Sequence, residues 1–178
     1  MTNKELVDSF IEEYFLCREY VCKKISGLEE KREELADYII YRIIFIWFLQ
    51  IKGILNDNKE YLINKFEEIK DSNLNYYEDF LNTLFFEGFT VLPKNREFKK
   101  QKILGNIPFL AQNLFMKSDL ENVYKNAIKI SNEAFYLESK TINRKNKVYP
   151  ILNMLKRYKW DLNEIKHDPN KLTPRILG

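Results

Sequence analysis

Glycine, proline, cysteine and histidine are all scarce in this chain of 178 residues. It has five glycines, five prolines, two cysteines and one histidine. An all-β fold needs turn residues every 8–12 positions or so, and their scarcity therefore argues against such a fold and favours long helices. Apolar residues make up 45% and charged residues 31% of the sequence. These shares are typical of a soluble globular protein, and the length suits one domain with a sizeable core.

The few cysteines and the single histidine do not suggest a metal site. Cys17 and Cys22 are five residues apart, which on a helix places them about 140° from each other and therefore on different faces. A zinc site needs more Cys or His than His167 can supply. We predict two free thiols in or near the core and a histidine on the surface.

The motifs of catalysis are also absent. The sequence has no GxGxxG or GxxxxGK[ST] loop to hold phosphates, and a single histidine cannot serve a Ser/His/Asp or Cys/His set convincingly. The carboxylates of residues 29–37 read as a solvated helix face. We therefore expect no catalytic, metal-binding or cofactor-binding residues in this chain.

Charge is distributed unevenly between the two halves of the chain. Residues 1–88 carry 11 Lys+Arg and 18 Asp+Glu, whereas residues 89–178 carry 18 and 8. The balances are −7 and +10, although the whole chain is only +3. Such an asymmetry hints at an anionic partner for the basic half. The alternative is an ordinary solvated surface.

Apolar periodicity predicts an all-α fold: an irregular bundle of about six to eight helices in a single domain, 1–178. Thr2 with Glu5, and Asp57 with Glu60, have the spacing of helix caps. A long irregular segment is expected near 88–117, and Thr173 and Pro174 suit the start of a last helical turn. Helices are predicted over 3–25, 28–52, 59–70 and 76–87, after Ser118, near Ser131 and over 148–158.

The central helix of this bundle should be the run from Tyr38 to Ile51, "YIIYRIIFIWFLQI". It is shorter than the ~20 apolar residues of a membrane span and contains Arg42, so we expect no membrane segment. A core helix buried on nearly every face is the better interpretation. Arg42 would then need a carboxylate or carbonyl partner, because an unpaired buried charge is costly.

Four stretches, taken in order, resemble one family. They are "YRIIFIWFLQIKGIL", "NLNYYEDFLNTLFFEGF", "LGNIPFLAQNLF" and "DPNKLTPRILG". They are similar to the helical region that precedes the methyltransferase domain in type IIG restriction–modification enzymes and related S-adenosylmethionine-dependent DNA adenine methyltransferases. Gln112 and Asn113 stand where that family usually has small residues or glycine.

The resemblance implies a chain that ends at the seam with a catalytic domain. The family's "NPPY"-type tetrapeptide and its glycine-rich cofactor loop do not occur here. S-adenosylmethionine is therefore implied for the full-length protein and not for this chain. The interpretation is a non-catalytic helical connector with a cytoplasmic location, which joins a methyltransferase domain and faces double-stranded DNA.

DNA contact is assigned to the basic half. Phosphate contacts position a protein without reading sequence, and they weaken with salt. The candidate residues are Lys94, Arg96, Lys99, Lys100, Lys102, Arg144, Lys145, Lys147, Lys156, Arg157 and Lys159. Tyr149, Tyr158 and Trp160 lie among the later ones, either as core residues beneath lysine stems or as rings that stack on a displaced base. The alternative function is a stand-alone helical module that binds a partner protein through an exposed apolar groove.

Overall fold

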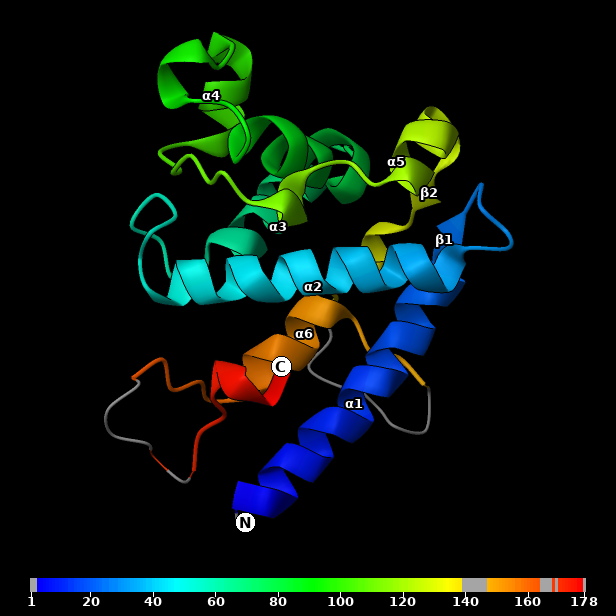
Figure 1. The fold of residues 1–178 in the computed structure, drawn as a ribbon, viewed down its shortest axis with the longest axis vertical. Coiled ribbons are helices and arrows are strands. Elements are labelled where there is room, and N and C mark those ends of the chain that lie inside the picture. The colour runs from blue at the N-terminus through cyan, green and yellow to red at the C-terminus, as the bar shows by residue number, and fades with distance from the viewer. Residues whose placement is uncertain (1–2, 139–146, 164–167, 169, 178) are drawn as a thin grey trace.

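The computed structural model describes residues 3–138, 147–163, 168 and 170–177, and the fold is all-α (Figure 1). Thr2 and His167 lie outside the described residues, as do Arg144 and Lys145. The α-helices are α1 (Asn3–Lys23), α2 (Arg32–Ile51), α3 (Tyr61–Asp71), α4 (Phe98–Leu104), α5 (Asp119–Tyr124) and α6 (Ile151–Arg157). Short 3₁₀ turns cover Pro93–Asn95, Asn113–Phe115, Lys125–Ala127, Asn132–Ala134 and Pro174–Leu177.

Helix α2 lies at the centre of the fold, as the sequence predicts. Figure 1 shows α1, α6 and the last turn on one side of α2, with α3, α4 and α5 on the other. Ile39, Ile43 and Ile46 are fully buried along it. The prediction of burial on nearly every face is wrong, because Tyr41 is 48% exposed and Phe45 and Phe48 are only half-buried. These three residues form an apolar strip that the described part of the chain leaves partly uncovered.

The helix predicted over 76–87 is present, but most of it has the wider hydrogen bonding of a π-helix. Its two π-helical parts are η1 (Tyr76–Leu81) and η2 (Leu84–Gly88). The Asn75 side chain caps its start by accepting from the backbone N–H of Glu78. Gly88 lets a neighbouring segment approach closely, since a Cβ there would lie 2.8 Å from Cδ1 of Ile107.

The irregular segment near 88–117 contains a helix that the sequence did not reveal. The sequence of helix α4, "FKKQKIL", has almost no apolar periodicity, because the helix buries only one residue, Leu104. The segment is held in place by side chains that donate hydrogen bonds to backbone carbonyls. Tyr61 donates its hydroxyl to the Leu104 carbonyl at 2.7 Å, and Arg96 donates to the carbonyls of Val91, Ile107 and Pro108.

Other boundaries differ in detail from the predictions. The helix predicted to begin at residue 28 begins at Arg32. The helix predicted to end at residue 25 ends at Lys23, because Ile25 belongs to a strand. That strand, β1 (Ile25–Ser26), pairs antiparallel with β2 (Lys129–Ile130). The proposed Asp57 cap is wrong: Asn58 Oδ1 accepts the Glu60 N–H, while Asp57 has a φ of 50°. Near Ser131 there is a single 3₁₀ turn.

Three expectations from the sequence concern a membrane span, the two cysteines and a metal site. Over those residues, no helix has both the length and the apolar character that crossing a bilayer requires. Cys17 is buried and Cys22 half-buried, both as free thiols, as predicted. The same part of the chain has no group of three or more His, Cys, Asp or Glu side chains placed to hold a metal ion.

Candidate functional site

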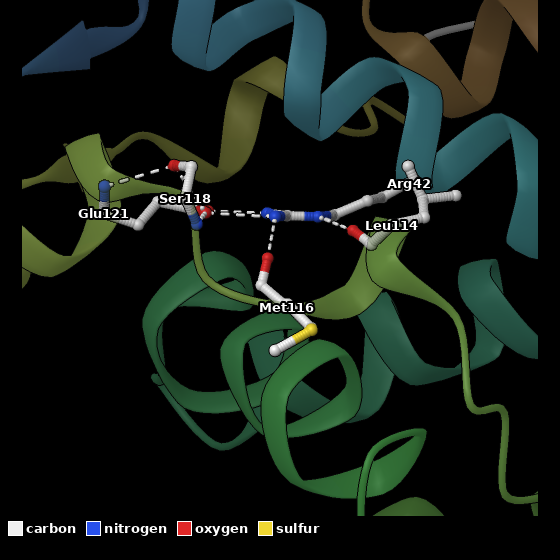
Figure 2. Close-up of polar contacts among 5 residues, drawn as sticks. All are labelled: Arg42, Leu114, Met116, Ser118 and Glu121. Atoms are coloured by element: carbon white, nitrogen blue, oxygen red, sulfur yellow. Dashed lines mark hydrogen bonds and ion pairs between the residues drawn. The ribbon is translucent and has the colours of Figure 1, made fainter.

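Arg42 is the buried charge at the middle of α2, and its partners come from far along the chain. Its side chain is 1% exposed. Figure 2 shows the guanidinium between the Glu121 carboxylate and two backbone carbonyls. It donates to both carboxylate oxygens at 2.5 and 3.0 Å, to the Leu114 carbonyl at 2.7 Å and to the Met116 carbonyl at 2.9 Å. The prediction of a carboxylate or carbonyl partner for Arg42 is confirmed, because the guanidinium has partners of both kinds.

Glu121 is held in place by the first turn of its own helix. Ser118 and Glu121 form a capping box, in which Ser118 Oγ accepts the Glu121 N–H at 3.2 Å and the Glu121 carboxylate accepts the Ser118 N–H at 2.9 Å. The "SDLE" stretch carries the S-x-x-E signal for this motif. Nothing in the sequence shows that the same carboxylate also reaches Arg42, 79 positions away.

Aromatic rings complete the surroundings of the Arg42 guanidinium. Its central carbon lies 5.0 Å from the ring centre of Phe86 and 5.3 Å from that of Phe85, both in η2. The ring face attracts a cation, and the effect is stronger where water is excluded. With its charge paired and its donors engaged, Arg42 is suited to holding segments together and not to proton transfer or nucleophilic chemistry.

Arg42 therefore joins three of the four stretches that carry the family resemblance. It belongs to the first stretch, Phe85 and Phe86 to the second, and the carbonyls of Leu114 and Met116 lie in or directly after the third. Gln112 and Asn113, the departures from the family pattern, are exposed beside this contact. We call this arrangement the Arg42 clasp.

The first basic group surrounds α4, and its members have different surroundings. The guanidinium of Arg96 is engaged by three backbone carbonyls, and burial lowers the pKa of this group. Lys100 pairs with Glu87 and lies near Glu97; the hydrogen bond with Glu87 raises its pKa. Lys94, Lys99 and Lys102 are exposed, and the described residues offer them no ion pair. We call these three the α4 lysines.

The later basic group contains internal ion pairs. Arg157 donates to the carboxylate of Glu13, a residue only 1% exposed, at 3.0 Å, and Lys156 lies 3.5 Å from a Glu60 oxygen. Lys147 and Lys159 are exposed. Figure 1 places α6 and α4 on opposite sides of α2, so the described parts of the two groups do not form one continuous face.

The aromatic residues near the later group are packed. Tyr149 is buried. Tyr158 and Trp160 are half-buried, and each meets the ring of Phe10 edge-on, at 5.2 and 5.4 Å between ring centres. Trp160 also donates its indole N–H to the Leu155 carbonyl. Tyr149 is thus a core residue, as one of the two interpretations predicts, whereas Tyr158 and Trp160 pack against the core and remain partly exposed.

The fold and the Arg42 clasp thus describe an all-α module whose buried charges have a structural role. Comparison with known proteins adds a relative from Methanocaldococcus jannaschii, described as a "putative type II restriction enzyme and methyltransferase". It is 32% identical to this chain over 161 residues. The match covers 86% of this chain but only 12% of the relative, so the chain spans about an eighth of the relative's length. No model of a protein family and no solved structure matches the sequence.

Proposed function

We propose that this chain is a non-catalytic helical connector and DNA-facing module of a type IIG restriction–modification enzyme or a related DNA adenine methyltransferase. One observation carries the proposal: most of the chain is similar to a small part of a much longer protein described as both a restriction enzyme and a methyltransferase. A segment that makes up 12% of such a protein leaves ample length for separate nuclease and methyltransferase domains.

The Arg42 clasp supports a role for this segment as a structural unit. Stretches that are separated along the chain, and that resemble consecutive parts of one family, meet at a single buried ion pair. Removing one partner of such a pair leaves an uncompensated charge, so the contact ties α2, η2 and the 107–118 segment to one arrangement. A fixed arrangement suits a connector that holds two other domains in register.

The α4 lysines are the residues best suited to DNA contact. They are exposed, they have no ion pair among the described residues, and they lie close together along 94–102. Non-specific binding of duplex DNA through such contacts has dissociation constants of roughly 10⁻⁴–10⁻⁶ M at physiological salt. We expect the weak end of that range, because the acidic half of the chain opposes the approach of DNA.

S-adenosylmethionine would be bound by other parts of the full-length protein. The sequence contains no glycine-rich cofactor loop, and among the described glycines Gly53 and Gly105 follow helix ends while Gly88 is packed against Leu104 and Ile107. The methyltransferase domain is thus the second proposed partner of this module, beside DNA.

The experiment that tests DNA contact compares two labelled duplexes of unrelated sequence by fluorescence anisotropy. We expect equal and weak binding of both, since phosphate contacts carry no sequence information. Strong preference for one duplex, or no binding of either at low salt, would contradict the proposal.

A second candidate function is protein–protein interaction, favoured by one observation. An apolar groove lies beside the exposed strip of α2, lined by Tyr41, Phe45 and Phe48 among other residues.

A further inference from the structure

Phe98 is the most exposed large hydrophobic side chain that the structure describes, at 83%. It begins α4 and, unlike the partly buried aromatic residues around it, does not pack against the core. A single exposed apolar residue is common on protein surfaces and needs no explanation by itself. The side chains that share its face of the helix make this ring unusual.

The inner side of α4 is defined by the contacts of three residues. Leu104 is buried, and Lys100 pairs with Glu87. Gln101 donates to the backbone carbonyl that follows the helix, at 2.9 Å. Successive residues of an α-helix are about 100° apart, so these three lie roughly 200–300° around the helix from Phe98. The position of Phe98 is therefore on the outer side.

The outer side of α4 carries the Phe98 ring together with cations. Phe98, Lys99 and Lys102 fall within about 100° of one another around the helix, and all three are exposed. Lys94 is exposed in the short turn that precedes the helix. Within the described ranges none of these lysines has an ion pair, so the ring lies among cations whose charge is not compensated by the chain.

An occupant of this surface should be a polyanion that also has flat apolar faces. Lysine is depleted in the interfaces between proteins, whereas it is an ordinary partner of phosphates. Each nucleic-acid base has a π-face on which an aromatic side chain can stack. The carboxylate next to Phe98 in sequence, that of Glu97, lies 3.4 Å from the Lys100 ammonium on the inner side. Nucleic acid therefore fits this surface better than an acidic protein does.

An aromatic side chain reaches a base face only where the stack of bases is open. Some DNA-binding proteins insert an apolar side chain such as Phe between two base steps and partly unstack them. Figure 1 shows α4 at one end of the molecule, away from the N-terminus. Duplex DNA can thus approach the outer side of α4 without meeting α1 or α6.

We propose that Phe98 stacks on an unstacked base of duplex DNA while the α4 lysines contact the neighbouring phosphates. This inference rests on the DNA-facing function proposed above, and it adds a preference for duplexes whose stack is easily opened. The lysines alone provide the phosphate contacts that position the chain on DNA. The preference comes from the ring.

Fluorescence anisotropy with two labelled duplexes of equal length and flanking sequence tests the proposal. One is fully paired, and the other has a single central mismatch, which costs less to unstack. We expect the whole chain to bind the mismatched duplex about fivefold more tightly or better. Phe98→Ala should remove this preference and leave both the affinity for the paired duplex and its salt dependence nearly unchanged, because the lysines remain. Phe98→Tyr should keep the preference.

The matched control is Phe15→Ala, since Phe15 is 62% exposed on α1, on the other side of α2. It should keep the preference. Tryptophan at either position gives a direct readout, because stacking on a base quenches indole fluorescence. The mismatched duplex should quench Phe98→Trp clearly more than Phe15→Trp, above the background of the buried Trp47 and the half-buried Trp160. Circular dichroism of every variant should match the wild type.

The outcomes separate this inference from the function on which it rests. A preference that persists in Phe98→Ala, or that is absent from a wild type whose binding still weakens with salt, would overturn the stacking role and leave the phosphate contacts in place. Equal quenching of the two tryptophan variants would also overturn it. A lack of salt-dependent binding to either duplex would overturn the DNA-facing function together with this inference.

Discussion

Arg42 is the residue on which the fold depends most clearly. Its charge is buried in an apolar helix and is compensated by Glu121 and by two carbonyls from a loop. A surface pair offers a comparison: Arg18 contacts Asp37 at 2.6 Å and keeps 27% of its side chain exposed. The two arginines make similar hydrogen bonds. Water can hydrogen-bond to the partner of Arg18 when Arg18 is removed, but it has little access to the buried partner of Arg42.

Replacing Arg42 by methionine should destabilise the chain by roughly 3–5 kcal/mol, because Glu121 is left buried without its partner. Arg18→Met, the matched control, should cost about 1 kcal/mol or less. Urea denaturation followed by circular dichroism measures both.

Combining Arg42→Met with Glu121→Leu should recover much of the loss, since a buried pair replaced by apolar side chains is often close to neutral. A single Arg42→Met variant that is as stable as Arg18→Met would show that the clasp does not hold the fold together.

The two cysteines should differ in reactivity despite their closeness in sequence. Burial raises the pKa of the Cys17 thiol well above its ordinary value, and burial also raises that of Cys22 to a smaller degree. A raised pKa lowers the thiolate fraction at a given pH, and the thiolate is the species that reacts.

At pH 8 iodoacetamide should therefore label Cys22 slowly and Cys17 only after unfolding. The rate at Cys22 should increase by up to about tenfold per pH unit until its pKa is reached. Mass spectrometry of digested samples distinguishes the two sites. Rapid labelling of native Cys17 would contradict its burial.

At the scale of elements, the sequence predicts the parts whose apolar residues repeat at helical spacing. The cores of α1, α2 and α3 follow that rule, and "SDLE" indicates the start of α5. Helix α4 could not be predicted from apolar periodicity, because only one of its residues, Leu104, is buried. The π-helical form of 76–88 could not be predicted either, because apolar periodicity does not distinguish π-helical from α-helical hydrogen bonding over so short a segment.

The faces of α2 lead to a ranked prediction. Ile44 is 2% exposed, whereas Phe48 is half-buried and lines the groove. Ile44→Asp should cost several kcal/mol by burying a carboxylate without a partner, and Phe48→Asp distinctly less because its carboxylate can reach water. Thermal unfolding at low protein concentration would show the order. Equal melting temperatures for the two variants would contradict the difference in burial between Ile44 and Phe48.

At the scale of the whole molecule, the sequence predicts the charge asymmetry but not where the charges lie. Several basic residues of the basic half, 89–178, have a carbonyl or carboxylate partner within the chain. They are Arg96, Lys100, Lys156 and Arg157. Those partners come from other segments, so local sequence cannot reveal them. Of the described candidates for DNA contact, we therefore favour the α4 lysines, Lys147 and Lys159, which are exposed and have no ion pair among the described residues.

A non-catalytic module should not bind the methyl donor by itself. Isothermal titration of this chain with S-adenosylmethionine should give no heat of binding, and incubation with DNA and the donor should give no methylated adenine. The reason is the lack of the glycine-rich loop and of the catalytic tetrapeptide in the sequence. Micromolar binding in the titration would contradict this assignment.

The salt dependence of duplex binding tests the central claim most directly. Each phosphate contact contributes a slope of about −0.9 to a plot of log affinity against log salt. Neutralising Lys94, Lys99 and Lys102 together by alanine should flatten the slope by up to about three contacts. The matched control neutralises Lys4, Lys31 and Lys59, exposed lysines of the acidic half, and should leave the slope nearly unchanged. Fluorescence anisotropy at two salt concentrations gives the result. Binding that is independent of salt, or equally reduced in both triple variants, would contradict a DNA-facing role for α4.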